Sequence, residues 1–148
     1  MLQVGDKIPD FTLQDQDGNA VSSSDLIGEP FVIYFYPKDD TPGCTKQACA
    51  FRDSLPRFKG VRVIGISPDS VKSHKKFAEK YSLPFTLLSD EGHKVAEMFG
   101  VWVEKSLYGK KYWGNQRSTF LFDEHGIVRA VWEKASPDQN VGELVAIL

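Results

Sequence analysis

Two thiols are the side chains of this sequence with the greatest potential for chemistry. Cys44 and Cys49 are the only cysteines among the 148 residues. A tetrahedral zinc site would require two further ligands, and the three histidines are scattered along the chain, at positions 74, 93 and 125. A structural disulfide is unexpected in a reducing compartment. The cysteine pair therefore favours redox chemistry, and we expect neither a metal site nor a cofactor.

The position of Cys44 favours an ionised, reactive thiol. The continuous apolar run 31–36 predicts a central strand, and Thr41 followed by Pro42 predicts the N-cap and first residue of a helix. Cys44 then becomes the third helical residue, where unpaired backbone N–H groups and the positive end of the helix dipole stabilise a thiolate. The alternative is that Cys44 is only a small buried hydrophobic residue, because it lies on the apolar stripe of that helix.

Strands that alternate with helices are expected around this site. Apolar, β-rich runs predict strands at residues 31–36, 61–67, 85–88, 119–122 and 128–132, the last two as a hairpin. A turn at residues 15–19 predicts short edge strands near 12–13 and 20–21. Apolar residues at helical spacing predict helices over residues 42–58, 69–81 and 93–99, and a last helix that begins at 136–137. This order indicates an α/β layer fold, and the lack of repeats and linkers indicates one domain over residues 1–148.

Charge and hydropathy bear on the class of partner. The formal net charge is −2, so that no general attraction to nucleic acid or to an anionic membrane is expected. The longest apolar run, residues 31–36, is far too short to span a bilayer. Residues 1–6 lack the basic and then apolar stretch of a signal peptide, which makes the cytoplasm the expected location, with an organelle reached through a cleaved transit peptide as the alternative.

The segment Pro37-Lys-Asp-Asp-Thr41-Pro-Gly-Cys44 resembles the Pro-x-x-x-Thr-x-x-Cys signature of the peroxiredoxins. The longer stretch 36–49 resembles the bacterioferritin comigratory protein subfamily, also called peroxiredoxin Q. Further similarity, in order and spacing, extends over residues 5–11, 89–90, 99–102 and 117–120. The resemblance implies a thioredoxin-like α/β fold, in which helices flank a central mixed β-sheet with an N-terminal β-hairpin extension. It also implies thiol-dependent reduction of hydrogen peroxide and organic hydroperoxides.

The resemblance assigns roles to individual residues. Cys44 would be the peroxidatic nucleophile, Thr41 would hydrogen-bond to the peroxide or the sulfur, and Pro37 would shield the pocket from water. Arg117 would stabilise the thiolate and help to hold the peroxide, a contact that no spacing in the sequence reveals. The sequence departs from the family pattern at Gln47, where many peroxiredoxins have a glutamate. A glutamine accepts a hydrogen bond but supplies no charge to orient Arg117, which puts that contact in question.

By the same resemblance, Cys49 would resolve the oxidised Cys44 through an intramolecular disulfide. In an α-helix, residues five apart have Cα atoms about 8.7 Å apart, beyond the roughly 7 Å that a disulfide spans. The helix is therefore expected to unwind locally when the disulfide forms. The alternative is that Cys49 is a bystander and that an external thiol resolves Cys44.

The sequence leaves the partner and several competing functions open. The expected reductant is thioredoxin, with glutaredoxin as an alternative, and the expected state is a monomer, with a weak dimer as the alternative. A thioredoxin-like disulfide oxidoreductase normally has Cys-x-x-Cys, whereas the spacing here is Cys-x4-Cys. A cysteine hydrolase requires a histidine base beside the sulfur, and no histidine here matches such a signature. A redox sensor or holdase would use the same sulfur chemistry, and only repeated turnover separates it from an enzyme.

Overall fold

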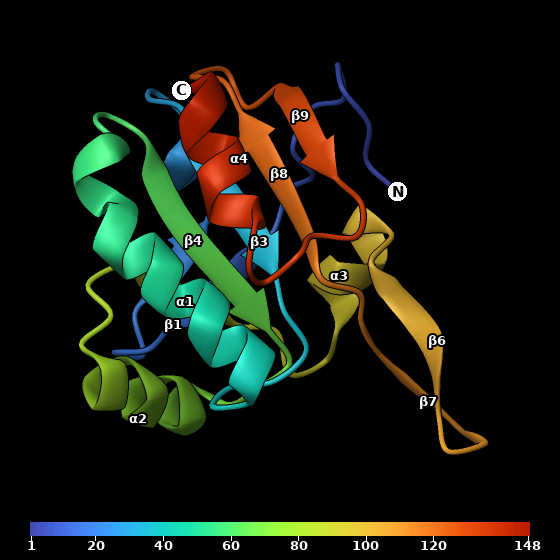
Figure 1. Cartoon of the computed structure of the whole chain (residues 1–148). Helices are drawn as coiled ribbons and strands as arrows, with labels where there is room; N and C mark the ends of the chain where they lie inside the picture. Colours follow the sequence, from blue (N-terminus) through green and yellow to red (C-terminus); the bar gives the residue numbers. More distant parts are fainter.

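The chain folds around a mixed β-sheet of seven strands (Figure 1), and the computed structural model describes residues 1–148. The strand order is β2-β1-β5-β4-β3-β8-β9. The bounds are β1 Thr12–Asp15, β2 Ala20–Ser22, β3 Phe31–Phe35, β4 Arg62–Ser67, β5 Thr86–Ser89, β8 Ser118–Phe122 and β9 Val128–Trp132. The central strands β3, β4 and β5 are parallel, whereas β1 and β8 pair antiparallel with them. The expected mixed sheet, with the β1–β2 hairpin at one edge, is confirmed.

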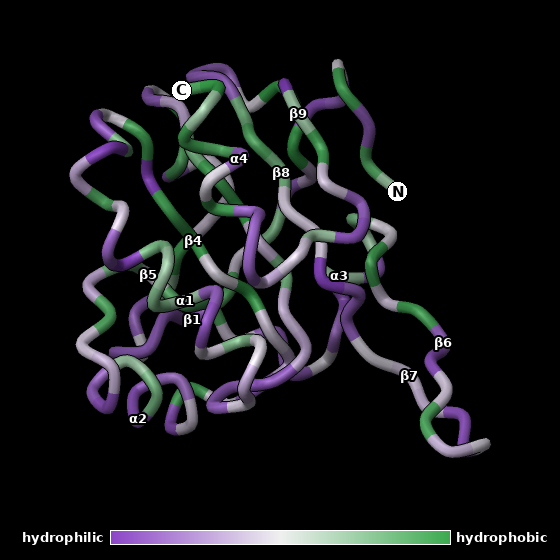
Figure 2. The backbone as a smooth tube through the Cα atoms, in the orientation of Figure 1, coloured by the Kyte–Doolittle hydropathy of each residue, from purple (hydrophilic) through white to green (hydrophobic).

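Helices cover both faces of this sheet (Figure 1). They are α1 Pro42–Ser54, α2 Val71–Tyr81, α3 Lys94–Phe99 and α4 Asn140–Ile147. Successive side chains of a strand point to opposite faces, so that the odd-numbered residues of β3 lie in one core with α3 and the even-numbered residues in a second core with α1, α2 and α4. Figure 2 shows the hydrophobic residues along the inner strands and the hydrophilic ones in the outer loops. None of the helices has the length and apolar content that crossing a bilayer requires.

One predicted helix start was wrong. The other predicted elements begin within two residues of the observed positions, but the last helix begins at Asn140 and not at residues 136–137. The Ser136 carbonyl accepts the N–H groups of both Gln139 and Asn140, at 3.3 and 3.0 Å. The serine–proline pair therefore forms a tight turn ahead of the helix, and this turn places Asn140 at the helix start.

A second, two-stranded sheet was not predicted from the sequence. Strands β6, Trp102–Leu107, and β7, Lys110–Asn115, form a hairpin that projects from the body as an arm (Figure 1). Its turn places Tyr108 at φ 51° and Gly109 at φ 79°, as a two-residue hairpin turn requires. Most of its residues are exposed, so that the arm lacks the apolar alternation by which strands are recognised.

Candidate active site

Cys44 lies at the start of helix α1, directly after the loop that follows the central strand β3. Thr41 has the extended backbone of an N-cap residue, at φ −102° and ψ 157°, and Pro42 is the first helical residue. The Thr41 carbonyl accepts the first helical hydrogen bond, from Thr45 N–H at 2.8 Å. Cys44 is therefore the third helical residue, as predicted, and its thiol is free and only 1% exposed. The N–H groups of this first turn have no acceptor within the helix and favour negative charge beside them.

The other two residues of the predicted signature surround this turn. The Thr41 hydroxyl donates to the Lys38 carbonyl at 2.9 Å and does not cap the helix with its side chain. Pro37 is half-buried in the bend that links β3 to the loop. Both residues thus border the first turn of α1, on the side from which the chain enters it.

Arg117 lies against the sulfur of Cys44, although 73 positions separate the two residues. Its Nη2 donates to Cys44 Sγ at 3.4 Å. Residue Gly43 leaves room for this approach, since a Cβ atom at that position would lie 3.1 Å from Nη2, and the guanidinium would have to shift by a few tenths of an ångström. A guanidinium next to a thiol favours the thiolate. Gly43, at a variable position of the Pro-x-x-x-Thr-x-x-Cys signature, therefore provides space for the guanidinium, which its sequence position alone did not reveal.

Gln47 holds the other side of the same guanidinium. Its Oε1 accepts from Arg117 Nη1 at 2.8 Å, and the side chain is fully buried. The contact that the glutamine put in question is present, and it is made by a neutral acceptor. Arg117 therefore bridges Gln47 and Cys44, two residues one turn apart on α1.

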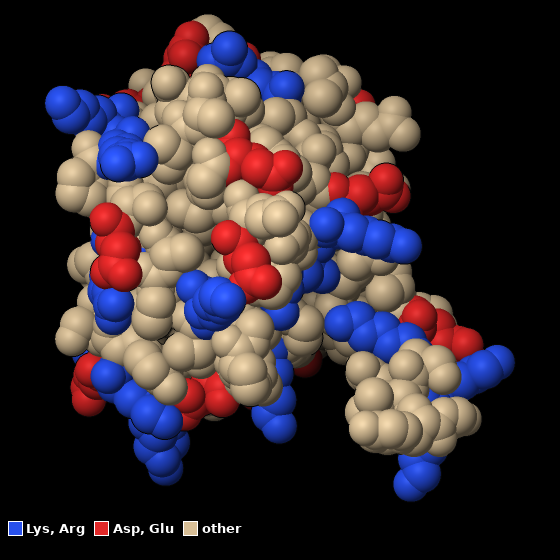
Figure 3. Space-filling model, viewed as in Figure 1, with Lys and Arg blue, Asp and Glu red and all other residues tan.

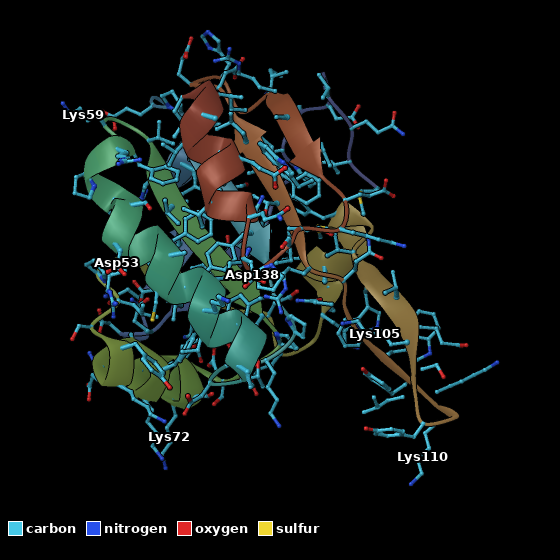
Figure 4. The ribbon with its side chains drawn as sticks, in the orientation of Figure 1. Asp53, Lys59, Lys72, Lys105, Lys110 and Asp138 are labelled. Atoms are coloured by element: carbon cyan, nitrogen blue, oxygen red, sulfur yellow. The ribbon has the colours of Figure 1, made fainter.

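Lys105 adds a second cation near the site. Burial lowers the pKa of Lys105 below its ordinary value, the charge of Arg117 lowers it further, and Cys44 raises it. Figure 4 shows Lys105 on the side of the projecting arm nearest α1, and Figure 3 shows basic side chains where the arm meets the body. The arm thus adds positive charge to the surroundings of the sulfur.

Comparisons with known proteins show the family to which the chain belongs. The model of the AhpC/TSA family matches residues 4–131. A Coxiella burnetii protein named putative peroxiredoxin bcp is 53% identical over 149 residues, which cover 99% of each chain. The chain is a peroxiredoxin of the AhpC/TSA family.

Further relatives of this peroxiredoxin carry the names Bcp and peroxiredoxin Q. The chloroplastic peroxiredoxin Q of Oryza sativa subsp. japonica is 52% identical over 97% of this chain, which spans 65% of that protein. The structure of a cysteine-to-serine mutant of Xylella fastidiosa PrxQ superposes with a TM-score of 0.93, at 31% identity, over 99% of this chain and 95% of that one. The bacterioferritin comigratory protein of Xanthomonas campestris superposes with a TM-score of 0.87, at 37% identity, over 93% and 88% of the two chains.

Membership of this family establishes the class of reaction. Peroxiredoxins are thiol-dependent peroxidases, which act on peroxide substrates and use thioredoxin-type reductants. The thioredoxin-like fold expected from the sequence is confirmed by the same structural neighbours.

Cys49 of this peroxiredoxin lies on the same helix as Cys44. Helix α1 is unbroken from Pro42 to Ser54, and both thiols are free. Cys49 is half-buried, whereas Cys44 is buried. Because helical residues five apart are too distant for a disulfide, the intact helix keeps the two sulfurs apart.

The loop between β3 and α1 is anchored on helix α2 through Asp39, a contact that no sequence pattern indicated. The buried Asp39 carboxylate accepts from the hydroxyls of Tyr36 at 2.5 Å and Ser73 at 2.8 Å, and it lies 2.8 Å from His74 Nδ1. The Asp39 N–H donates to the Asp69 carboxylate at 2.8 Å. Asp39, Asp69 and His74 lie close enough to share a cation, but hydrogen bonds already occupy their facing atoms. This cluster is best described as an anchor of the loop.

Asp40 makes a second, more exposed anchor on α2. Its carboxylate accepts from Lys80 Nζ and from the Tyr81 hydroxyl, both at 2.7 Å. Its backbone is left-handed, at φ 55°, a conformation that aspartate and asparagine tolerate better than most residues. The hydrogen bond from Lys80, and after it that from Tyr81, lowers the pKa of Asp40 below its ordinary value of 3.8.

We predict that Asp40→Asn lowers the free energy of unfolding near neutral pH. Because the pKa of Asp40 is lowered on folding, the stabilisation is complete above the ordinary pKa of 3.8 and is lost as the pH falls through the lowered value. The difference between variant and wild type should therefore shrink in strong acid. Urea unfolding at a series of pH values measures this difference in the free energy of unfolding. The exposed Glu91→Gln serves as the control. A difference that is independent of pH would contradict the assignment.

Proposed function

We propose that Cys44 is the nucleophile of the peroxidase reaction. Its thiolate attacks one oxygen of the hydroperoxide, so that an S–O bond forms while the O–O bond breaks. Cys44 becomes a sulfenic acid. The second oxygen leaves with the electron pair and takes up a proton, which yields water from hydrogen peroxide or an alcohol from an organic hydroperoxide. The reaction requires no metal and no organic cofactor.

The observation that carries this proposal is the contact between Arg117 and the sulfur. A donor 3.4 Å from Cys44 Sγ, together with the free N–H groups of the first helical turn, favours the ionised thiol. The same donors can stabilise the negative charge that develops on the leaving oxygen, as in an oxyanion hole.

Thr41 and Pro37 complete the proposed site. The Thr41 hydroxyl, whose one proton is donated to the Lys38 carbonyl, would accept a hydrogen bond from the bound peroxide, or would turn away from Lys38 to donate to the sulfur. Pro37 is half-buried in the preceding bend and has no N–H to bind water, and it would shield the sulfur of Cys44 from water.

Cys49 is proposed to resolve the oxidised Cys44. Its thiolate attacks the sulfur of the sulfenic acid, an S–S bond forms, and the hydroxyl leaves as water after it takes up a proton. The first turns of α1 must unwind for the two sulfurs to meet. The flanks of this segment are tied to α2, by Asp39 on one side and on the other by Arg52, whose Nη1 donates to the Tyr81 carbonyl at 2.6 Å. Unwinding is therefore expected to stay within residues 41–51.

One equivalent of hydrogen peroxide is expected to convert the wild type into a form with a Cys44–Cys49 disulfide. Mass spectrometry identifies the link. Hydrogen exchange should then rise by about tenfold or more in residues 41–51, because their helical hydrogen bonds are lost, and stay unchanged in α2. The matched control is Cys49→Ser, in which Cys44 should remain a sulfenic acid and the helix should stay protected. A lasting sulfenic acid in the wild type, or a disulfide form with a protected helix, would refute the scheme.

We further propose that thioredoxin itself reduces this disulfide, with glutaredoxin as the alternative. A partner thiolate would attack one sulfur and form a transient mixed disulfide. Repeated turnover with the reductant distinguishes this enzyme from a stoichiometric redox sensor. Action as a single-domain monomer over residues 1–148 and a location in the cytoplasm remain predictions, and the plant relatives are named as chloroplastic.

A further inference from the structure

Asn140, the first residue of helix α4, is joined by hydrogen bonds to the site around Cys44. Helix α4 lies beside α1 on the same face of the sheet (Figure 1). The Asn140 side chain is fully buried, and its Oδ1 accepts from the Thr119 hydroxyl at 2.7 Å and from Gln47 Nε2 at 3.3 Å. Gln47 in turn contacts Arg117, and Arg117 contacts the sulfur. The hydrogen bonds therefore run without a break from α4 to Cys44.

The donors of Arg117 identify which atom of Gln47 faces Arg117 and which faces Asn140. A guanidinium only donates, so the Gln47 atom that faces it must be the carbonyl oxygen Oε1. The amide nitrogen of Gln47 then points the other way, into a region where Gln47 and Asn140 are both fully buried. A buried N–H group needs an acceptor, and Asn140 Oδ1 supplies it.

This arrangement leaves Asn140 with an unsatisfied polar atom. Its Nδ2 is buried and has no hydrogen-bond partner. An unpaired buried donor is unfavourable, so that the amide would gain from turning its nitrogen elsewhere if its oxygen were not needed where it is. The unpaired nitrogen therefore indicates that the acceptor oxygen is the part of Asn140 that the site requires.

We propose that Asn140 is a positioning residue for the peroxidase reaction. It keeps Gln47 turned with its carbonyl toward Arg117, and this contact in turn holds Arg117 against the sulfur of Cys44. The proposal rests on the proposed role of Cys44 as the nucleophile. A carboxylate at position 47 would present an acceptor in either orientation, so the need for Asn140 follows from the glutamine of this chain.

The test replaces the acceptor and then restores it. Asn140→Leu has a similar size but no acceptor, and we expect it to lower the rate of Cys44 oxidation by hydrogen peroxide about tenfold and to move the pH–rate profile toward higher pH. Asn140→Asp, which keeps an acceptor oxygen, should recover most of the rate. In the Gln47→Glu background, Asn140→Leu should change the rate by less than about twofold, because no amide needs orienting.

Controls separate positioning from folding. Val141→Ala removes buried volume from the same helix without touching the chain of hydrogen bonds, and it should keep the wild-type rate and pH profile while it lowers thermal stability. If Asn140→Leu does not fold, Asn140→Ala carries the same expectations.

Two results would overturn the proposal: wild-type kinetics in the acceptor-free variant, or an equal loss in the Gln47 and Gln47→Glu backgrounds. The Cys44→Ser variant, measured in parallel, tests the proposed nucleophile separately. If Cys44→Ser retains the reaction, the proposed function fails whatever Asn140 does.

Discussion

The Cys44→Ser variant is expected to reduce hydroperoxide at least about 10⁴-fold more slowly than the wild type, as is typical when an enzyme loses its nucleophile. A serine hydroxyl fits the space of the thiol but is not ionised near neutral pH, so that neither the first turn of α1 nor Arg117 can convert it into a nucleophile. The fold should tolerate the change, because the two side chains differ by one atom.

Cys49→Ser is the matched control for this experiment, since it makes the same substitution on the same helix. Stopped-flow measurement of the first turnover should give a rate close to that of the wild type for Cys49→Ser and no reaction for Cys44→Ser. Both variants should fail in repeated turnover with thioredoxin. Cys44→Ser lacks the proposed nucleophile, and Cys49→Ser is not recycled after its first turnover. A fast first turnover in Cys44→Ser, with none in Cys49→Ser, would show that Cys49 is the nucleophile and Cys44 the resolving cysteine.

Arg117→Met is expected to lower the rate of the first turnover by about 10²-fold, the size of effect seen when a donor to developing negative charge is removed. Methionine fills much of the space of arginine but loses the donor to Cys44 Sγ and the charge that favours the thiolate. The pH–rate profile should move toward higher pH for the same reason. Arg117→Lys keeps a charge but not the planar guanidinium that reaches Gln47 and Cys44 together. The rate of its first turnover should lie between that of the wild type and that of Arg117→Met.

Arg129→Met serves as the control for Arg117, because it removes an exposed arginine from the neighbouring strand β9. It should leave both the rate and the pH profile unchanged. An Arg117→Met variant within about twofold of the wild type would contradict the stabilising role that the 3.4 Å contact supports.

Much of the fold and the position of Cys44 at the start of a helix could be predicted from the sequence, because both depend on local patterns. The strand β3, the N-cap position of Thr41 and the third helical position of Cys44 all follow from neighbouring residues along the chain. The start of α4 was misplaced because a serine followed by proline suits a turn as well as a helix start. The exposed arm of β6 and β7 has no apolar periodicity, and no local pattern could reveal it.

The surroundings of the sulfur were decided by the tertiary structure. Strands β3 and β8 pair antiparallel with Phe35 opposite Ser118, and this register brings Arg117 to the end of β3, where the chain turns toward Cys44. The contact between Gln47 and Asn140 joins residues 93 positions apart, and the anchor of Asp39 on His74 joins residues 35 apart. Local preferences act over about one helical turn. Contacts across such separations depend on strand order and register, so that the sequence alone placed Cys44 in the first turn of a helix, whereas the packed fold supplied the charge and hydrogen bonds around its sulfur.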